Sequence, residues 1–232
     1  MDVLKFGELE ARVVGTHGPV VVLLHGFGAP GTDLVSLARV LGPNRRYVFP
    51  EAPLTLPPMF GPGRAWWMLD LEKLQLAMLT GVPRDLSVEH PEGLVRAREQ
   101  MLGLLEAVEA HFGVLRSDIV LGGFSQGAML SCDVALHTDE ALRGLVLLSG
   151  SFVAGDWWRP RMNRLTGQNV FQSHGTQDTV LAISGAEALR DGLEGGGAQV
   201  QWHSFRGGHE IPMDVIEALR GYLPPGEPQS GQ

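Results

Sequence analysis

The segment Gly-Phe-Ser-Gln-Gly at 123–127 constrains the fold most, because it joins the apolar run 119–121 to a segment that can continue as a helix. A serine at a sharp turn between a strand and a helix has a strained backbone conformation. The residues two before and two after it are crowded against each other, so glycine suits both positions. The sequence therefore predicts a turn that holds the hydroxyl of Ser125 out above one end of a sheet.

Two further motifs follow downstream, and each comes just after a predicted strand. Asp178 is the last residue of the motif His-Gly-Thr-Gln-Asp, which follows the apolar stretch 170–171. His209 lies in the motif Gly-Gly-His-Glu, which follows the alternating run 200–205. The chain order serine, aspartate, histidine is the one expected of α/β-hydrolases. A serine hydroxyl needs a base and a third group that orients the base. We therefore expect Ser125 to be a nucleophile, His209 its base and Asp178 the orienting acid.

Other acids and histidines compete for these roles. His174 follows a strand directly and is expected to support the loop that carries Asp178. Asp133 lies eight residues after Ser125, within the predicted helix of the nucleophile, and Asp156 comes too early in the order of strands. Glu210 is interpreted as a solvated carboxylate.

An oxyanion intermediate requires two preorganised amide donors. We expect one to be the backbone N–H of Gln126, at the start of the helix after Ser125. The other is assigned to the backbone N–H of Phe27, in the glycine-containing loop 24–28 after the first buried strand. His25 lies in the same loop, where a structural hydrogen bond is the favoured interpretation.

Short apolar strands alternate with helical patterns along the chain. Runs at 20–24, 119–121, 145–148 and 170–171 suit strands that are covered on both faces. Apolar residues at three- and four-residue spacings predict an amphipathic helix over 91–112, with Pro91 in its first turn and Gly113 at its end. The pattern predicts an α/β fold, a doubly wound and mostly parallel sheet flanked by helices. We expect one domain over 1–223 and a flexible tail over 224–232.

The alternation is interrupted over about 53–90. This stretch contains five prolines, a Trp-Trp pair and a short helical pattern through Trp67, Leu71, Leu74 and Met78. We interpret it as a Trp/Pro-rich, lid-like insertion over the site. The expected walls of the substrate pocket are Trp66, Trp67, Met68, Trp157 and Trp158. Packing of these side chains in the core is the alternative.

Composition excludes several classes of function. The net charge of −8 and the lack of clustered lysines and arginines argue against nucleic-acid binding. Cys132 is the only cysteine, so an intrachain disulfide is impossible and packing is its expected role. The amino terminus has no signal-peptide pattern, and no run is long enough for a membrane span. A cytoplasmic location is therefore expected.

Four motifs together resemble the phospholipase/carboxylesterase family of small serine hydrolases, which includes the acyl-protein thioesterases. They lie at 24–28, 122–127, 174–180 and 208–210. The resemblance implies an α/β-hydrolase without a large cap domain, needing no metal or other cofactor. It also implies cleavage of small carboxylic esters or thioesters through an acyl-enzyme, and a homodimer is possible. Ala29 departs from the family, because many relatives have an acidic residue at this position.

The leading hypothesis is a carboxylesterase that prefers short to medium acyl chains, since tryptophans on two loops favour a narrow pocket. An acyl thioesterase or a lysophospholipase-type enzyme would use the same three residues. A peptidase or lactonase on the same fold is a further alternative. The non-enzyme alternative is a protein of this fold that binds a ligand without turnover.

Overall fold

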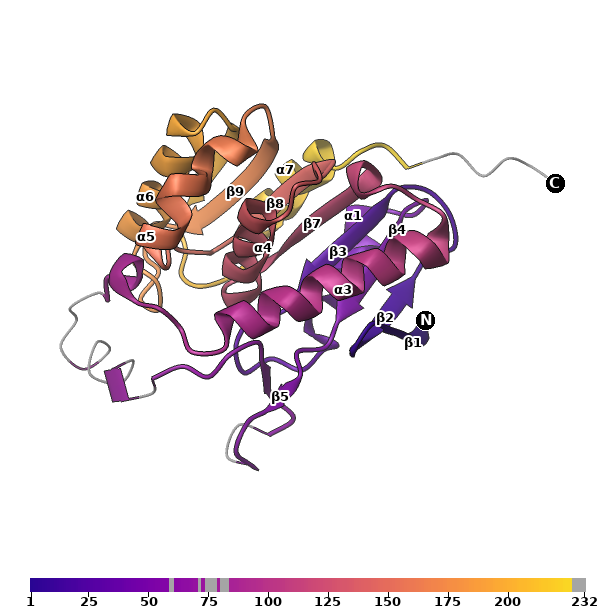
Figure 1. Cartoon of the computed structure of the whole chain (residues 1–232), viewed down its shortest axis with the longest axis horizontal. Coiled ribbons are helices and arrows are strands. Elements are labelled where there is room, and N and C mark those ends of the chain that lie inside the picture. Colours follow the sequence, from indigo (N-terminus) through magenta and orange to yellow (C-terminus); the bar gives the residue numbers. More distant parts are fainter. Residues whose placement is uncertain (59–60, 71, 74–78, 80–83, 227–232) are drawn as a thin grey trace.

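The computed structural model describes residues 1–58, 61–70, 72–73, 79 and 84–226. Its main element is an eight-stranded sheet (Figure 1). In chain order the strands are β1 (Asp2–Phe6), β2 (Leu9–Val14), β3 (Val20–Leu24), β4 (Arg46–Pro50), β7 (Ile119–Phe124), β8 (Gly144–Leu148), β9 (Asn169–Gly175) and β10 (Gln199–Phe205).

The spatial order of the strands is β1-β2-β4-β3-β7-β8-β9-β10. The pairs β1–β2 and β2–β4 are antiparallel, and the other five pairs, from β4 to β10, are parallel. The chain therefore winds outward from β3 in two directions, which confirms the doubly wound, mostly parallel sheet. The winding reverses between β3 and β7, and ligands of such sheets bind beyond the carboxyl ends of the strands at this reversal.

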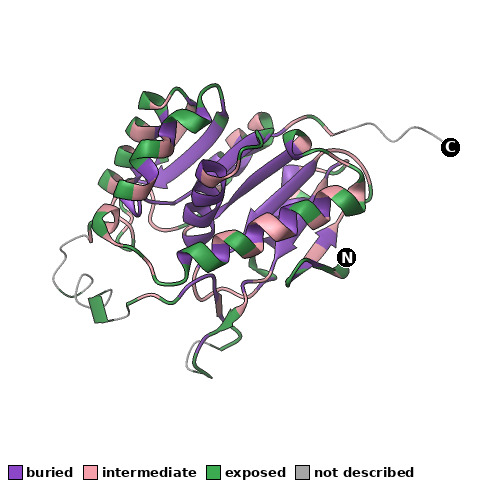
Figure 2. Ribbon diagram, in the orientation of Figure 1, coloured by how far each residue is buried: buried purple, intermediate pink, exposed green. Residues whose placement is uncertain are grey.

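Helices cover both faces of the sheet (Figures 1 and 2). The α-helices in the described part of the chain are α1 (Leu37–Leu41), α3 (Leu94–Phe112), α4 (Gln126–His137), α5 (Gly155–Trp158), α6 (Ile183–Gly195) and α7 (Met213–Tyr222). Residues of α3, α4, α5 and α6 pack in one hydrophobic cluster, and residues of α1 and α7 pack in another. Within β3, Val20, Val22 and Leu24 belong to the first cluster, whereas Val21 and Leu23 belong to the second. This division explains why every residue of β3 is apolar.

The long helix α3 differs from its prediction at one end. It ends at Phe112 before Gly113, whose φ of 64° is the left-handed conformation that favours glycine, as expected. It begins only at Leu94, so Pro91 precedes the helix and does not lie in its first turn. The reason is Gly93, whose φ of 93° interrupts the helical conformation.

The stretch 53–90 contains a second, two-stranded sheet of β5 (Leu54–Thr55) and β6 (Arg64–Ala65). The helical pattern predicted through Leu71, Leu74 and Met78 falls on residues outside the described part of the chain, and so does most of the predicted tail. Of the helices that the structure describes, none has both the length and the apolar character needed to cross a membrane.

Candidate active site

Ser125 lies in the tight turn between β7 and α4, with φ of 54° and ψ of −116°. This conformation is strained for a residue with a side chain. A Cβ atom on Gly123 would lie 2.5 Å from the carbonyl oxygen of Leu24 and 2.6 Å from the carbonyl carbon of Gly127. A Cβ atom on Gly127 would lie 2.2 Å from the same Leu24 oxygen. The crowding expected around Ser125 is confirmed, and the neighbouring strand β3 contributes to it.

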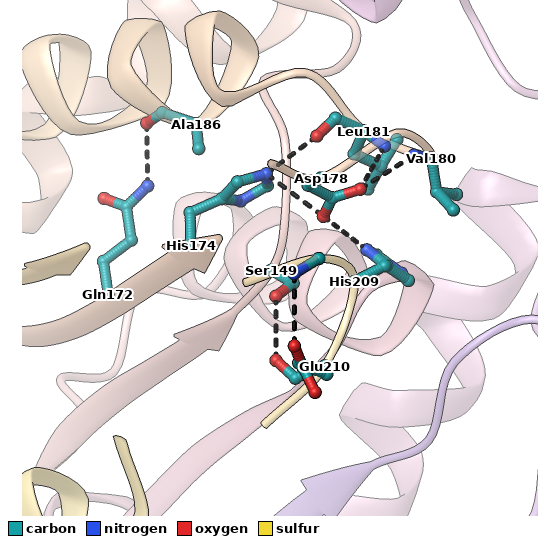
Figure 3. A network of polar contacts seen from close by, with 10 residues as sticks. Ser149, Gln172, His174, Asp178, Val180, Leu181, Ala186, His209 and Glu210 are labelled. Carbon is teal, nitrogen blue, oxygen red and sulfur yellow. Dashed lines mark hydrogen bonds and ion pairs between the residues drawn. The ribbon is translucent and has the colours of Figure 1, made fainter. Parts of the chain in front are cut away.

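Asp178 and His209 meet because the strands before them are paired. β9 and β10 are parallel, with Gly175 opposite Phe205, so the loops after these strands leave the same edge of the sheet. The Nδ1 atom of His209 lies 2.7 Å from Oδ2 of Asp178 (Figure 3). A carboxylate oxygen can only accept, so Nδ1–H donates and Nε2 is left as the basic nitrogen.

The other oxygen of Asp178 is held by the backbone. The N–H groups of Val180 and Leu181 donate to Oδ1 at 2.8 and 2.9 Å. Burial by itself would raise the pKa of Asp178, but the hydrogen bonds from His209, Leu181 and Val180 outweigh it and lower the pKa. Asp178 is therefore ionised at neutral pH and can stabilise a positive charge on His209.

His174 supports the loop that carries Asp178. Its side chain is fully buried at the end of β9, and its Nε2–H donates to the carbonyl oxygen of Leu181 at 2.8 Å. The same nitrogen lies 3.3 Å from Oδ2 of Asp178 (Figure 3). Burial lowers the pKa of His174, so the ring is neutral at pH 7. The supporting role predicted for His174 is confirmed.

Ser125 and His209 line a common cavity of about 160 Å³. Phe27 and Gln126, which carry the two expected amide donors, line it as well. The other described residues that line it are mostly apolar: Leu69, Arg84, Leu86, Met129, Ser151, Val180, Leu181, Ala182 and Gly185. The sequence patterns did not identify these residues, because they come from separate loops and from the buried face of α4.

A larger groove of about 810 Å³ adjoins this cavity. Four residues line both spaces: Leu69, Arg84, Leu86 and Met129. Arg84 is fixed there by Glu89, with its Nε 3.2 Å and its Nη2 2.5 Å from the two carboxylate oxygens. The ion pair therefore lies where the small cavity meets the groove.

The predicted aromatic pocket requires correction. None of the five predicted residues is among the described residues that line the cavity at Ser125. Trp67 and Met68 line the adjoining groove, whereas Trp66 and Trp158 are buried in the core. Trp157 packs against the ring of His90, with a centroid separation of 4.8 Å. The indole N–H groups of Trp66 and Trp158 bond to partners beneath the surface, which directs both rings inward.

His25 has the structural role expected for it. Its Nδ1–H donates to the carbonyl oxygen of Gly26 at 2.8 Å, and its Nε2 accepts from the N–H of Ala52 at 3.1 Å. Both ring nitrogens are therefore occupied, and the ring is 2% exposed. Burial lowers the pKa of His25, which keeps the ring neutral.

The rival acids lie outside the cavity. Asp133 is buried between helices, where its Oδ1 accepts from Nε1 of Trp158 at 2.8 Å and its Oδ2 lies 3.1 Å from Nε of Arg98. Asp156 is exposed and lies 2.6 Å from Nε2 of His90. Cys132 is fully buried, and burial raises the pKa of its thiol, so its packing role is confirmed. Among the residues that the structure describes, no cluster of three or more His, Cys, Asp or Glu side chains could hold a metal ion.

The sheet order, the strained turn at Ser125 and the Asp178–His209 pair together define an α/β-hydrolase fold. The sequence over residues 13–224 matches the model of the Phospholipase/Carboxylesterase family, and the protein belongs to this family of hydrolases.

Relatives and solved structures agree with this membership. The chain is 29% identical to acyl-protein thioesterase 1 of Yarrowia lipolytica over 89% of this chain and 91% of that protein. It is 34% identical to acyl-protein thioesterase 1 of Eremothecium gossypii over 72% of this chain and 69% of that protein. The crystal structure of esterase PE8 superposes with a TM-score of 0.79 at 28% identity, covering 92% of this chain and 97% of the esterase. A Mesorhizobium loti carboxylesterase has the same fold, with a TM-score of 0.76 at 19% identity over 95% of this chain and 97% of that one.

Proposed function

We propose that this protein is a serine esterase that hydrolyses carboxylic esters of short to medium acyl chains through an acyl-enzyme. The observation that carries the proposal is the 2.7 Å hydrogen bond between Asp178 and His209, next to a cavity that His209 shares with Ser125. In this mechanism Nε2 of His209 takes the hydroxyl proton of Ser125 as the oxygen attacks the ester carbonyl. Ionised Asp178 holds the ring and stabilises the imidazolium that forms.

The tetrahedral intermediate carries a negative charge on the former carbonyl oxygen. We assign its stabilisation to the backbone N–H groups of Phe27 and Gln126. Gln126 is the first residue of α4, and the N–H groups of a first helical turn have no acceptor within the helix. His209 then returns the proton to the leaving alcohol. Water repeats the sequence and releases the acid.

The cavity favours a small acyl group. Its volume of about 160 Å³ is below the roughly 300–1,000 Å³ of sites for drug-sized ligands. Its apolar walls, including Leu69 and Met129, suit an alkyl chain. The predicted preference for short to medium chains is therefore supported by the volume of the cavity, although the tryptophans do not form its walls.

The decisive experiment measures hydrolysis of p-nitrophenyl esters from acetate to palmitate by the wild-type protein and by Ser125→Ala. We expect an optimum at short to medium chains and loss of the activity in the variant. A rate that climbs steadily to palmitate would contradict the acyl preference. Full activity in the variant would exclude Ser125 as the nucleophile. Turnover of no ester by the folded protein would favour a ligand-binding protein without turnover.

Thioester hydrolysis is the second candidate function, and it uses the same residues. The observation that favours it is the sequence similarity of this chain to two proteins named acyl-protein thioesterase 1. The groove of about 810 Å³ beside the cavity offers space for a longer acyl chain. Comparing kcat/KM for an acyl thioester and an oxygen ester of the same chain length distinguishes the two candidates.

A further inference from the structure

The segment 64–67 contacts the loop that carries the first proposed amide donor, Phe27. The N–H of Gly28 donates to the carbonyl oxygen of Arg64 at 2.9 Å, and the N–H of Arg64 donates to that of Ala29 at 3.1 Å. The indole Nε1–H of Trp66 donates to the carbonyl oxygen of His25 at 2.9 Å. The loop is therefore bonded to this segment on both sides of Phe27.

The same segment contacts the residue that carries the second proposed donor, Gln126. The side-chain Oε1 of Gln126 accepts from the N–H of Trp66 at 3.0 Å, and its Nε2 donates to the carbonyl oxygen of Trp67 at 2.8 Å. Both polar ends of this side chain are thus bonded to the backbone of 66–67. Gln126 is 1% exposed and Trp66 is 2% exposed, so water is excluded from these bonds.

The outer end of the segment is held by charge. Glu51 accepts from Nε of Arg64 at 2.9 Å and from Nη1 of Arg12 at 2.8 Å. Burial by itself would raise the pKa of Glu51, but the two guanidinium groups outweigh it and lower the pKa. Ionised Glu51 therefore holds the side chain of Arg64, and the backbone of Arg64 bonds to the loop that carries Phe27. Ala29 has no carboxylate of its own and contributes only its carbonyl oxygen to these bonds.

We propose that Trp66 is a positioning residue, which acts with the side chain of Gln126 to set the separation between the amide groups of Phe27 and Gln126. Trp66 bonds to His25 through its indole and to Gln126 through its backbone, so a single residue joins the two loops. Oxyanion donors act only when they converge within hydrogen-bond distance of one oxygen. This inference rests on the proposed function, since it requires an oxyanion at Ser125.

The test compares Trp66→Phe with Trp158→Phe. Each variant keeps an aromatic ring and removes one buried indole N–H. Trp66→Phe loses the hydrogen bond to the carbonyl oxygen of His25, and Trp158→Phe loses the one to the carboxylate of Asp133. Trp158 is fully buried and does not line the cavity, so it controls for the general effect of a lost core hydrogen bond. The measurements are kcat and KM for p-nitrophenyl butyrate, the inhibition constant of a trifluoromethyl ketone, and Tm.

We expect kcat of Trp66→Phe to fall about tenfold or more, because losing one oxyanion donor costs about 10²- to 10³-fold and a displaced donor loses part of that. KM should change less than about twofold, since the ground-state ester uses these donors weakly. Affinity for the trifluoromethyl ketone, which forms a tetrahedral adduct, should weaken by the same factor as kcat/KM. Trp158→Phe should lower Tm and leave kcat within about twofold of wild type.

Equal kcat values for the two tryptophan variants would overturn the inference. If Trp66→Phe does not fold, Gln126→Met decides, because it keeps a side chain of similar length and removes both bonds to 66–67. An unchanged kcat in Gln126→Met would overturn the inference, and a fall matched by weaker ketone binding would support it. Failure of the proposed function is distinct, since it would appear as inactive wild-type protein or as an active Ser125→Ala variant.

Discussion

The Oδ2 atom of Asp178 lies 2.7 Å from Nδ1 of His209, although the two residues are 31 positions apart in the chain. The carboxylate of Asp178 is also held by groups other than His209. The N–H groups of Val180 and Leu181 donate to its other oxygen, and His174 lies beside it. Only the histidine side of the pair reaches the cavity that Ser125 lines. The arrangement places an oriented base on the wall of a cavity that the strained Ser125 also lines.

Asp178→Asn should lower kcat on the order of 10³- to 10⁴-fold, because the amide does not hold His209 in the tautomer with a basic Nε2. The matched control is Asp156→Asn, which removes an exposed carboxylate that bonds His90 outside the cavity. Its kcat should equal that of the wild type. Steady-state kinetics on one p-nitrophenyl ester checks both variants, and a loss smaller than about tenfold in Asp178→Asn would exclude Asp178 as the orienting acid.

The pH dependence of activity should differ from that of stability. The lowered pKa of Asp178 keeps the carboxylate ionised at pH 5 to 8, so a fall in kcat/KM toward acid pH within this range should report the base and not Asp178. The folded-state pKa of Asp178 lies below the unfolded value near 3.9. Its contribution to the free energy of unfolding is therefore complete above about pH 4 and is lost as the pH falls through the folded-state pKa.

Two measurements separate these effects. A pH–rate profile reports the protonation of the base, and urea unfolding of wild type and Asp178→Asn at pH 7 and pH 3 reports the carboxylate. The difference in unfolding free energy should shrink at pH 3. A rate that stays flat down to pH 4.5 would contradict His209 as the base.

Gly127→Ala should reduce both stability and activity. The added Cβ would lie 2.2 Å from the backbone oxygen of Leu24, and a backbone atom cannot rotate aside. We expect a destabilisation of roughly 1–3 kcal/mol, as for overpacked cores. The control is Gly103→Ala within α3, where an added Cβ meets no atom within 4 Å. This change should stabilise the protein by about 0.5–1 kcal/mol in chemical denaturation and leave kcat unchanged.

Arg98→Met should destabilise the protein by about 3 kcal/mol at pH 8, because it leaves the buried carboxylate of Asp133 without its cationic partner. Burial already raises the pKa of Asp133, against the effects of Arg98, Trp158 and His137. Without Arg98 the folded state binds a proton more readily than the unfolded state, so the loss should shrink as the pH falls. The double variant Asp133→Asn/Arg98→Met should recover most of the loss in urea unfolding. A double variant as unstable as Arg98→Met would contradict this account.

Arg84→Ala should shift the chain-length optimum to longer esters. Arg84 lines both the small cavity and the groove, and its removal would join the two spaces. The ratio of kcat/KM for p-nitrophenyl decanoate to that for the butyrate should rise by at least about tenfold, since burying only two of the six additional methylenes at about 0.8 kcal/mol each is enough for this increase. Glu89→Gln is the control, because it removes the negative charge of the ion pair but leaves the volume of the Arg84 side chain unchanged. An unchanged ratio would show that Arg84 does not limit the acyl chain.

The sequence predicted best where one local pattern determined the structure. The all-apolar run of β3 indicated a strand covered on both faces, and both hydrophobic clusters do contact it. The edge strand β1 and its neighbour β2 were not identified, because β1 is mostly exposed and the burial of β2 alternates. The start of α3 was misplaced because Pro91 resembles a first-turn residue, whereas the positive φ of Gly93 prevents a helix there.

The sequence did not predict the direction in which the tryptophan side chains point. The tryptophans at 66 and 158 were expected to form walls of the pocket, and both point into the core. An indole has an apolar ring and a single N–H donor, so its position depends on which acceptor is buried nearby. For Trp66 that acceptor is the carbonyl of His25, and for Trp158 it is the carboxylate of Asp133. Neither partner is near its tryptophan in sequence.

The sequence by itself determined the turn at Ser125 and the order of the three proposed catalytic residues. Gly123 is crowded by Gly127, which is close in the chain, and both glycines are crowded by Leu24 of β3. The motif is readable without coordinates because Ser125 and its two glycines lie within five consecutive residues. The tertiary structure decided how far the side chains reach: that Asp178 contacts His209, that the cavity is small and apolar, and that Trp66 joins two loops. These contacts depend on strand order and on packing between distant segments, and no local pattern encodes either.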